Sequence, residues 1–226
     1  MRAYAREQRR QGRILGLVPT MFSVNEDFSV YPRGLERDLE LLKEAGCHAV
    51  FLPSSLYHPG TNAPTAADTS MVICKIFNIV DPDVAIFGKK DYQQWRVLER
   101  MARDLDFGIE VVGMDTVREE DGVALSSRNA LLSPEHRAAA PAIYKALRSA
   151  ADAVCGGKNR SAQEIAAAVS NSIALAGGSV DYVHVVDAET MAPLTVFGPR
   201  LALIAVAAFF GSVRLIDNIE VPPVEA

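Results

Sequence analysis

The chain has 226 residues, of which 49% are hydrophobic, and its formal net charge is −5. This length can bury one large core or two modest ones, and the acidic balance gives no global attraction to nucleic acid. Three widely spaced cysteines without a C-x-x-C pair argue against a zinc knot or a disulfide scaffold and favour buried or half-buried free thiols: Cys47, Cys74 and Cys155.

Neither the start of the chain nor its apolar runs indicate a membrane segment. Residues 1–13 are basic and lack the apolar centre of a signal peptide, so we expect a solvated helix there. The longest apolar run, Leu201 to Phe210, is too short to span a bilayer. We therefore expect a cytoplasmic protein that binds neither nucleic acid nor membranes.

Strand-like and helix-like patterns alternate over the first half of the chain. Apolar runs that stop at proline, glycine or a polar residue predict strands at 14–18, 49–52, 84–87 and 109–112. Helical periodicity predicts helices between them, at 33–44, 69–80 and 92–105. Such alternation predicts an α/β fold built from parallel βαβ units, in which ligands lie beyond the carboxyl ends of the strands. We therefore predict a doubly wound, Rossmann-like nucleotide-binding domain over residues 1–117.

After Val117 the pattern changes to that of a smaller α+β domain, residues 118–226. Asp121 and Gly122 predict a tight turn, and Ser133 followed by Pro134 predicts a helix start. We expect that helix to run toward Leu147. The remaining pattern predicts a second helix and three strands, at 162–176, 182–186, 202–209 and 213–219.

Gly88, Lys89, Lys90 and Asp91 follow the predicted strand at 84–87 and open the next helix. Glycine lets the backbone approach a ligand closely, while lysine and a helix N-terminus both favour negative charge. An isolated segment of this kind is more often a solvated turn. Its position at the end of a strand favours a phosphate site instead.

Two other segments carry groups suited to the same chemistry. Ser126, Ser127 and Arg128 place two hydroxyls beside a guanidinium, which can clamp phosphate oxygens, although a serine-rich loop with a surface arginine is the ordinary alternative. Residues 19–21 (Pro-Thr-Met) end the first predicted strand. Residues 19–21 and 88–91 therefore lie at strand ends of one predicted sheet.

Together, Val18-Pro19-Thr20-Met21, the run from Phe87 to Gln94 and the run from Ala124 to Asn129 resemble the pantothenate synthetases, or pantoate–β-alanine ligases. The resemblance continues from Asp181 to Ile219. It implies an ATP-dependent enzyme that first forms pantoyl adenylate and pyrophosphate from (R)-pantoate. The amine of β-alanine then displaces AMP to form pantothenate. It also implies Mg²⁺ with ATP and a homodimer.

The resemblance also implies roles for individual residues. ATP would be bound by Pro19, Thr20, Met21, Gly88, Lys89, Lys90, Asp91, Val117, Leu125, Ser126, Ser127 and Arg128. Within that set, catalytic work on the phosphates falls to Lys90, Ser126, Ser127 and Arg128. Gln94 and Met21 would bind pantoate, and Asp38 is the candidate metal residue, against the alternative of a solvated helix face. These roles require Lys90 and Arg128 to share one hollow.

Two parts of the family pattern are absent. Met21 is followed by Phe22 rather than by the family's glycine and His-x-Gly-His signature, and a second hole falls between Ser54 and Ser70. No histidines have the signature's spacing, so we interpret all four as structural or surface residues: His48, His58, His136 and His184.

Three interpretations stay open. Segments of the molecule are missing from the printed sequence, or a genuine internal deletion leaves an impaired relative that only binds nucleotide or dimerises, or the chain is a different nucleotidyltransferase. We favour the first over the second, because a sheet that loses an interior strand is left with unpaired buried edges.

Overall fold

The structure, a computed structural model, describes residues 15–17, 35–51 and 66–225. The chain divides into two compact units. The first comprises Met1–Phe87 and Gln94–Gly113, and the second comprises Gly88–Gln93 and Met114–Ala226. The second unit therefore begins near the predicted boundary at Val117 and also takes in the turn at 88–93. The assignment of the two predicted domains to separate functions stays a prediction.

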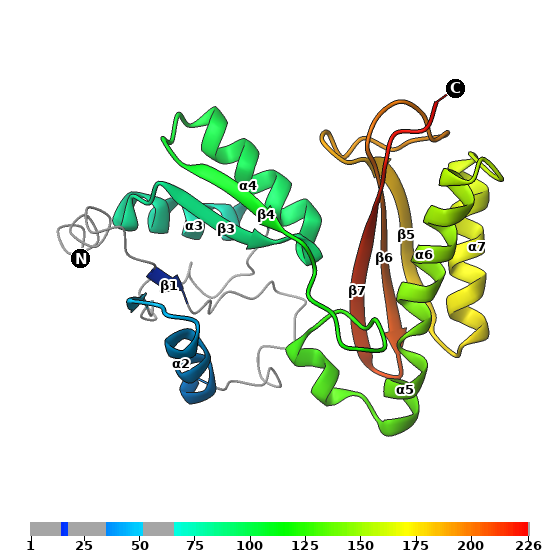
Figure 1. Cartoon of the computed structure of the whole chain (residues 1–226), viewed down its shortest axis with the longest axis horizontal. Helices are drawn as coiled ribbons and strands as arrows, with labels where there is room; N and C mark the ends of the chain where they lie inside the picture. Colours follow the sequence, from blue (N-terminus) through cyan, green and yellow to red (C-terminus); the bar gives the residue numbers. More distant parts are fainter. Residues whose placement is uncertain (1–14, 18–34, 52–65, 226) are drawn as a thin grey trace. The chain divides into compact units, whose positions relative to one another are not determined.

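The first unit alternates strands and helices, as the sequence pattern predicts (Figure 1). Its elements are β1 (Leu15–Leu17), α2 (Leu35–Glu44), β2 (Ala49–Phe51), α3 (Ala66–Val80), β3 (Val84–Gly88), α4 (Tyr92–Asp104) and β4 (Glu110–Met114). β1 pairs with β2 in parallel, and β3 pairs with β4. The four strands and three helices expected between residues 14 and 112 are present, with their ends displaced by a few residues, whereas the helix expected over residues 1–13 lies outside the described residues.

A small apolar core holds α3 and α4 together. Phe77 on α3 packs edge-on against Phe87 and Phe107, with ring centroids 6.4 and 5.7 Å away. Leu98 on α4 is fully buried in the same cluster. The buried residues of α3 recur at helical spacing, so one stripe of the helix faces this core.

The second unit has helices on one face of an antiparallel sheet (Figure 1). Its main elements are α5 (Pro134–Ala139), α6 (Ala142–Cys155), α7 (Ala162–Leu175), β5 (Ser179–Asp187), β6 (Ala202–Phe210) and β7 (Val213–Val221). The strand order is β5-β6-β7, with α7 packed along β5 and α6 along β7. In the described parts of the chain, no helix is long and apolar enough to cross a membrane.

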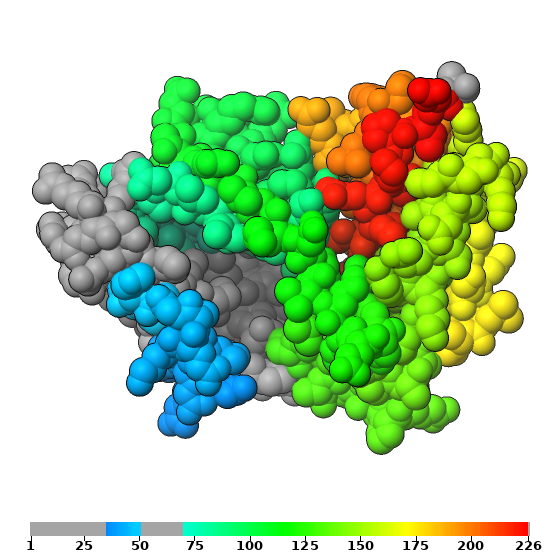
Figure 2. All heavy atoms as spheres, in the orientation of Figure 1, coloured from blue at the N-terminus to red at the C-terminus, as the bar shows by residue number. Residues whose placement is uncertain are grey.

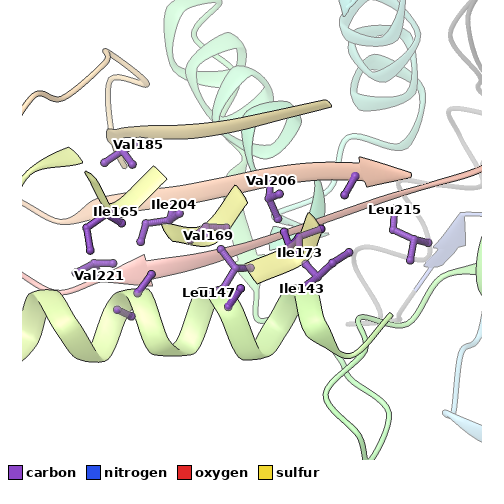
Figure 3. Packing of buried hydrophobic residues seen from close by; sticks show 14 of the residues in the cluster. Ile143, Leu147, Ile165, Val169, Ile173, Val185, Ile204, Val206, Leu215 and Val221 are labelled. Carbon is purple, nitrogen blue, oxygen red and sulfur yellow. The ribbon is translucent and has the colours of Figure 1, made fainter. Parts of the chain in front are cut away.

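The main core lies between the two helices and this sheet. Side chains of α6, α7 and the strands meet there, among them Leu147, Ile173 and Ile204, all with no exposed surface (Figure 3). Atoms of α6 lie directly against those of β7 in the space-filling view (Figure 2). Fully burying each such side chain contributes about 1.5–3 kcal/mol, so this layer is the main support of the unit.

The helix predicted from Ser133 toward Leu147 is wrong as a single element. Ser133 does cap the helix start by accepting a hydrogen bond from the backbone N–H of His136, and Pro134 lies in the first turn. The helix nevertheless ends at Ala139, and α6 begins only after Pro141. Proline has no N–H to donate and its ring crowds the preceding turn, so Pro141 separates α5 from α6.

The cysteines and histidines have ordinary environments. All three cysteines are free thiols, as predicted, but Cys155 is exposed rather than buried or half-buried. His136 Nδ1 lies 2.9 Å from the hydroxyl of Ser133, and the His184 ring stacks on Tyr182. These two histidines act within the fold, whereas His58 lies outside the described residues.

Candidate active site

The turn formed by Lys89–Asp91 is a short 3-10 helix between β3 and α4, and it packs against β7 of the second unit. The backbone leaves β3 in an extended conformation at Gly88 and becomes helical at Tyr92. Tyr92 is buried, with 4% of its surface exposed. The turn is therefore fixed on β7, the last strand of the chain, which is distant from it in sequence.

Lys89 and Tyr92 both bind Glu220 on β7. Lys89 Nζ lies 3.1 Å from Glu220 Oε2 and 3.3 Å from Asp115 Oδ1, and the Tyr92 hydroxyl donates to Glu220 Oε1 at 2.8 Å. Burial alone would lower the pKa of Lys89, but its bonds and charge attraction to Glu220 and Asp115 outweigh burial and raise that pKa. Lys89 therefore stays protonated and paired with these carboxylates at neutral pH.

Asn218 holds the backbone of the same turn. Its side-chain amide donates to the carbonyl oxygens of Lys89 and Lys90, at 2.9 Å each. Asn218 is 8% exposed, so both bonds are shielded from water. A buried amide must find partners for its donors, and here it finds them in two consecutive peptide groups.

A second segment, 117–125, is held on β7 by a buried ion pair. Arg118 makes a two-pronged contact with Asp217, at 2.7 and 2.9 Å, and its guanidinium lies 3.8 Å from the centre of the Tyr144 ring. The Asp217 side chain is only 3% exposed. Such forked contacts fix orientation as well as distance, so the segment has one defined position on the strand.

The predicted turn at Asp121 and Gly122 is confirmed, and charged side chains brace it. Gly122 has a backbone φ of +93°, a conformation that glycine adopts readily. Arg137 donates to Glu119 and Asp121 at 2.6 Å each, and these bonds lower the pKa of both carboxyls. Both carboxylates therefore stay ionised well below neutral pH.

The serine-arginine loop continues directly from this hairpin. The Ser126 hydroxyl accepts a hydrogen bond from the backbone N–H of Arg128 at 3.3 Å and caps the short 3-10 helix Ser127–Leu131. The Asn129 amide donates to Glu119 and to the carbonyl of Ala124, at 2.9 and 3.1 Å. These contacts fix the backbone that carries the hydroxyls and the guanidinium.

The two segments meet at one hollow within the second unit, which we call the basic hollow. Its lining includes Lys90, Ser126, Arg128, Tyr144, Arg214 and Asp217. Three of these side chains are cations, of which Arg214 is paired with Asp181, and the one carboxylate is paired with Arg118. The cavity volume is about 20 Å³, room for about one water. The basic hollow therefore gathers charge suited to phosphate oxygens without enclosing a large ligand.

The structure thus brings together three of the four predicted catalytic residues, Lys90, Ser126 and Arg128, and gives Lys89 a different environment. Lys89 does not line the basic hollow. Ser127 is exposed on the same loop as Arg128. Leu125 N donates to Val117 O, and these two residues expose 51% and 66% of their surfaces.

Asp91 and Gln94 are exposed, and Gln94 belongs to the first unit. Pro19, Thr20 and Met21 lie outside the described residues.

Asp38, the candidate metal residue, lies exposed on α2 beside an exposed Arg37–Glu40 pair. Among the described residues, no group of three or more His, Cys, Asp or Glu side chains could hold a metal ion. Mg²⁺ is usually held by one or two carboxylates together with substrate phosphates, so the metal role of Asp38 stays a prediction.

Sequence reasoning missed the support of the site: Arg118, Tyr144, Asp217, Asn218 and Glu220. The signal for two of them was present, since Asp217 and Asn218 interrupt the apolar residues of the strand predicted at 213–219, and Glu220 follows directly after it. Polar residues in a buried strand need partners, and here the partners lie in the turn at 88–93 and in the segment 117–125.

Comparison with known proteins gives consistent matches. The family model described as pantoate-beta-alanine ligase matches residues 18–220. The pantoate–beta-alanine ligase of Arabidopsis thaliana is 36% identical, over 98% of this chain and 95% of its own length. The pantothenate synthetase of Moorella thermoacetica is 42% identical, over 89% of this chain and 77% of its own length.

Solved structures agree with these matches. The crystal structure of pantothenate synthetase from Thermus thermophilus superposes with a TM-score of 0.82 at 38% identity, covering 97% of this chain and 87% of that one. The ligase from Francisella tularensis, complexed with beta-gamma ATP and beta-alanine, shares the fold at a TM-score of 0.68 and 23% identity, covering 96% and 83%. The predicted α/β fold class with a second, separate sheet is confirmed.

The alignment with the Arabidopsis relative also bears on the two holes. It runs over 297 residues, more than the 226 of this chain. Stretches of the alignment therefore have no counterpart here, in keeping with the segments that the sequence lacks.

Proposed function

This chain belongs to the pantoate–β-alanine ligase family, and from that membership we propose that it joins (R)-pantoate to β-alanine with ATP. A pantoate carboxylate oxygen attacks the α-phosphorus of ATP, and the bond from that phosphorus to the bridging oxygen breaks, releasing pyrophosphate. The amine of β-alanine then attacks the acyl carbon of pantoyl adenylate. AMP leaves, the amine loses a proton, and pantothenate is formed.

The chemistry requires charge neutralisation and positioning rather than a covalent nucleophile on the protein. A free carboxylate resists attack by an amine, whereas an acyl phosphate anhydride has a good leaving group. Preorganised cations and hydrogen-bond donors act where charge develops in the transition state. The observation that carries the proposal is that Lys90 lines one hollow with Ser126 and Arg128, although the serine-arginine loop is a separate segment of the chain.

We assign roles on this basis. Lys90 and Arg128 neutralise phosphate charge, and the Ser126 and Ser127 hydroxyls donate to phosphate oxygens. The exposed apolar side chains of Val117 and Leu125 suit the flat base of the nucleotide. The remaining proposed contacts of ATP are Pro19, Thr20, Met21, Gly88, Lys89 and Asp91.

Pantoate is proposed to bind Gln94 and Met21, and Mg²⁺ is proposed to arrive with the phosphates of ATP. The Francisella relative is complexed with beta-gamma ATP and beta-alanine, which supports ATP and β-alanine as substrates of this chain. We further propose a cytoplasmic homodimer, and light scattering tests its oligomeric state directly.

Replacing Lys90 tests the proposal. We expect Lys90→Ala to lower the rate of ATP- and pantoate-dependent pyrophosphate release by about 10²–10³-fold, because one preorganised cation is lost. Lys145 is an exposed lysine on α6 outside the hollow, so Lys145→Ala is the matched control and should keep the wild-type rate. A folded Lys90→Ala protein with wild-type turnover would remove this assignment.

The missing His-x-Gly-His signature favours one alternative, an impaired relative that binds nucleotide or dimerises without turnover. Loss of such donors lowers the rate of an enzyme by about 10²–10³-fold each. This alternative predicts no AMP release from pantoate, β-alanine and excess ATP. Pyrophosphate release with other acceptors would instead indicate a different nucleotidyltransferase. An intact mass near 24.4 kDa establishes a true internal deletion, whereas a mass several kilodaltons higher establishes that segments are missing from the sequence.

A further inference from the structure

Asp217 and Asn218 are consecutive residues of β7, and each holds one of the two segments that form the basic hollow. Asp217 binds Arg118, which belongs to the segment leading into the serine-arginine loop. Asn218 binds the backbone of Lys89 and Lys90. Successive side chains of a strand point to opposite faces, so one short stretch of β7 can serve both segments.

We propose that Asp217 and Asn218 are positioning residues that set Lys90 and Arg128 at the spacing required by a polyphosphate chain. The proposal rests on the proposed function of the basic hollow. Neither residue is assigned a chemical step, because each acts on the phosphate-binding groups through another residue.

The Asn218 contacts fix the direction of the Lys90 side chain. The Lys89 carbonyl belongs to the peptide group before the Lys90 Cα, and the Lys90 carbonyl belongs to the one after it. Two bonds of 2.9 Å therefore restrain both peptide planes around that Cα. Because those planes define the Lys90 backbone angles, they also define where its Cβ points. Glu220 adds a second restraint through the side chains of Lys89 and Tyr92.

The Asp217 contacts fix the other segment. Arg118 Nη1 also donates to the Gly122 carbonyl at 3.0 Å, and Arg118 forms a β-bridge with Ala124 just before the loop. Asp217 Oδ1 accepts both from Arg118 and from the Asn218 backbone N–H, at 2.9 and 2.8 Å. One carboxylate oxygen of Asp217 therefore contacts both Arg118 and the backbone of Asn218, the residues that hold the two segments.

The chemistry of the two side chains is not interchangeable. Asn218 faces two carbonyl oxygens, which need donors, while Asp217 faces a guanidinium and an N–H, which need an acceptor. A carboxylate at 218 would face two acceptors at close range and would lose both bonds. The side chains of asparagine and aspartate have nearly the same shape. Asn218→Asp therefore removes the two hydrogen bonds to the turn without changing the packing.

The test is a double-mutant cycle with Asn218→Asp and Lys90→Ala. We expect Asn218→Asp alone to lower the rate of pyrophosphate release by about 10²-fold, since a small misplacement of a positioned group has effects of that size. In the Lys90→Ala background the same substitution should change the rate by less than about threefold, because the group that it positions is gone. Asn171→Asp, an exposed substitution on α7, is the charge-matched control and should keep the wild-type rate.

The cycle separates positioning from simple structural support. If Asn218→Asp lowers the rate by the same factor with and without Lys90, or leaves it at the wild-type value, the proposal is overturned. Should Asn218→Asp fail to fold, Asn218→Ala removes both donors without adding charge and runs the same cycle.

Affinity for a non-hydrolysable ATP analogue, measured by calorimetry, gives a readout independent of turnover. A wild-type chain that releases no pyrophosphate would contradict the proposed function. The positioning role then stands or falls on whether Asn218→Asp weakens analogue binding about tenfold with Lys90 present and not without it.

Discussion

The two units differ in what their ion pairs connect. In the second unit, Arg118 pairs with Asp217 across 99 positions of sequence, and Lys89 hydrogen-bonds to Glu220 across 131. In the first unit, charged pairs such as Arg37–Glu40 and Arg100–Asp104 join neighbours on one helix. Long-range pairs fix segments relative to one another, whereas pairs of the second kind only support the helix that carries them.

This difference indicates that the sheet of the second unit fixes the positions of the residues in the proposed site. The hairpin sheet of the second unit is built from strands that follow one another in the chain, so it offers a continuous frame. The two segments that line the basic hollow contain little regular structure and depend on that frame for their positions. The core supplies the frame, and a few buried polar contacts attach the segments to it.

The largest effect that tests this comparison should come from Arg118. Arg118→Met keeps most of the apolar stem but leaves the buried Asp217 carboxylate without its partner, so we expect a loss of about 3–5 kcal/mol in the free energy of unfolding. Arg100→Met is the matched substitution in the first unit, and its pair is exposed to water. Urea unfolding should show no measurable change for Arg100→Met, and equal losses for the two variants would contradict the distinction.

Much of this arrangement follows from local sequence rules. Apolar runs and helical periodicity predicted the strands and helices of both units, and the Ser133 cap and the Gly122 turn have the predicted geometry. The rule that ligands bind at the carboxyl ends of parallel strands predicted a site at Lys90. These features depend on residues that are close together in the chain.

The different environments of Lys89 and Lys90 could not be predicted in the same way. The two residues are identical and adjacent, and tertiary contacts distinguish them, since Lys89 pairs with Glu220 and Asp115 while Lys90 lines the basic hollow. No residue near position 89 in the sequence indicates that Glu220 will lie beside Lys89. The helix break at Pro141 is a different kind of miss, because a proline inside a predicted helix is a local signal that should have divided it.

The next largest effects should come from the two cores. Leu147 on α6 and Leu98 on α4 are both fully buried, in the second and first unit respectively. Replacing either with alanine leaves a cavity and should cost about 2–5 kcal/mol. If the units are separate cooperative bodies, each substitution should destabilise mainly its own unit.

The single tryptophan makes that distinction measurable. Trp95 on α4 belongs to the first unit and packs against Gly113 of β4. We expect Leu98→Ala to shift the urea midpoint followed by tryptophan fluorescence more than Leu147→Ala does. Far-ultraviolet circular dichroism, which also reports the second unit, should show the effect of Leu147→Ala. Equal shifts of both probes by both variants would mean that the units unfold as one body.

The smallest expected effect concerns acid stability of the second unit. Asp187 is buried at the end of β5, where one carboxylate oxygen accepts the Thr190 N–H at 2.8 Å and its hydroxyl at 2.9 Å, and Arg200 lies 3.1 Å from the other. The backbone bond from Thr190 is the main cause that lowers the pKa of this carboxyl below its usual 3.8. The carboxylate therefore stabilises the fold above pH 3.8, and this contribution is lost as the pH falls from there through the lowered pKa.

Asp187→Asn removes the charge but keeps the shape. At neutral pH the variant should lose about 1 kcal/mol, the difference between hydrogen bonds to a charged and to a neutral acceptor. Below pH 3.8 its stability should fall less steeply than that of the wild type, because this position no longer takes up a proton. The change should appear in circular dichroism of the second unit and leave the Trp95 transition in place. Identical pH slopes for variant and wild type would show that the Asp187 turn has no part in acid stability, and a shifted Trp95 transition would show that the turn also stabilises the first unit.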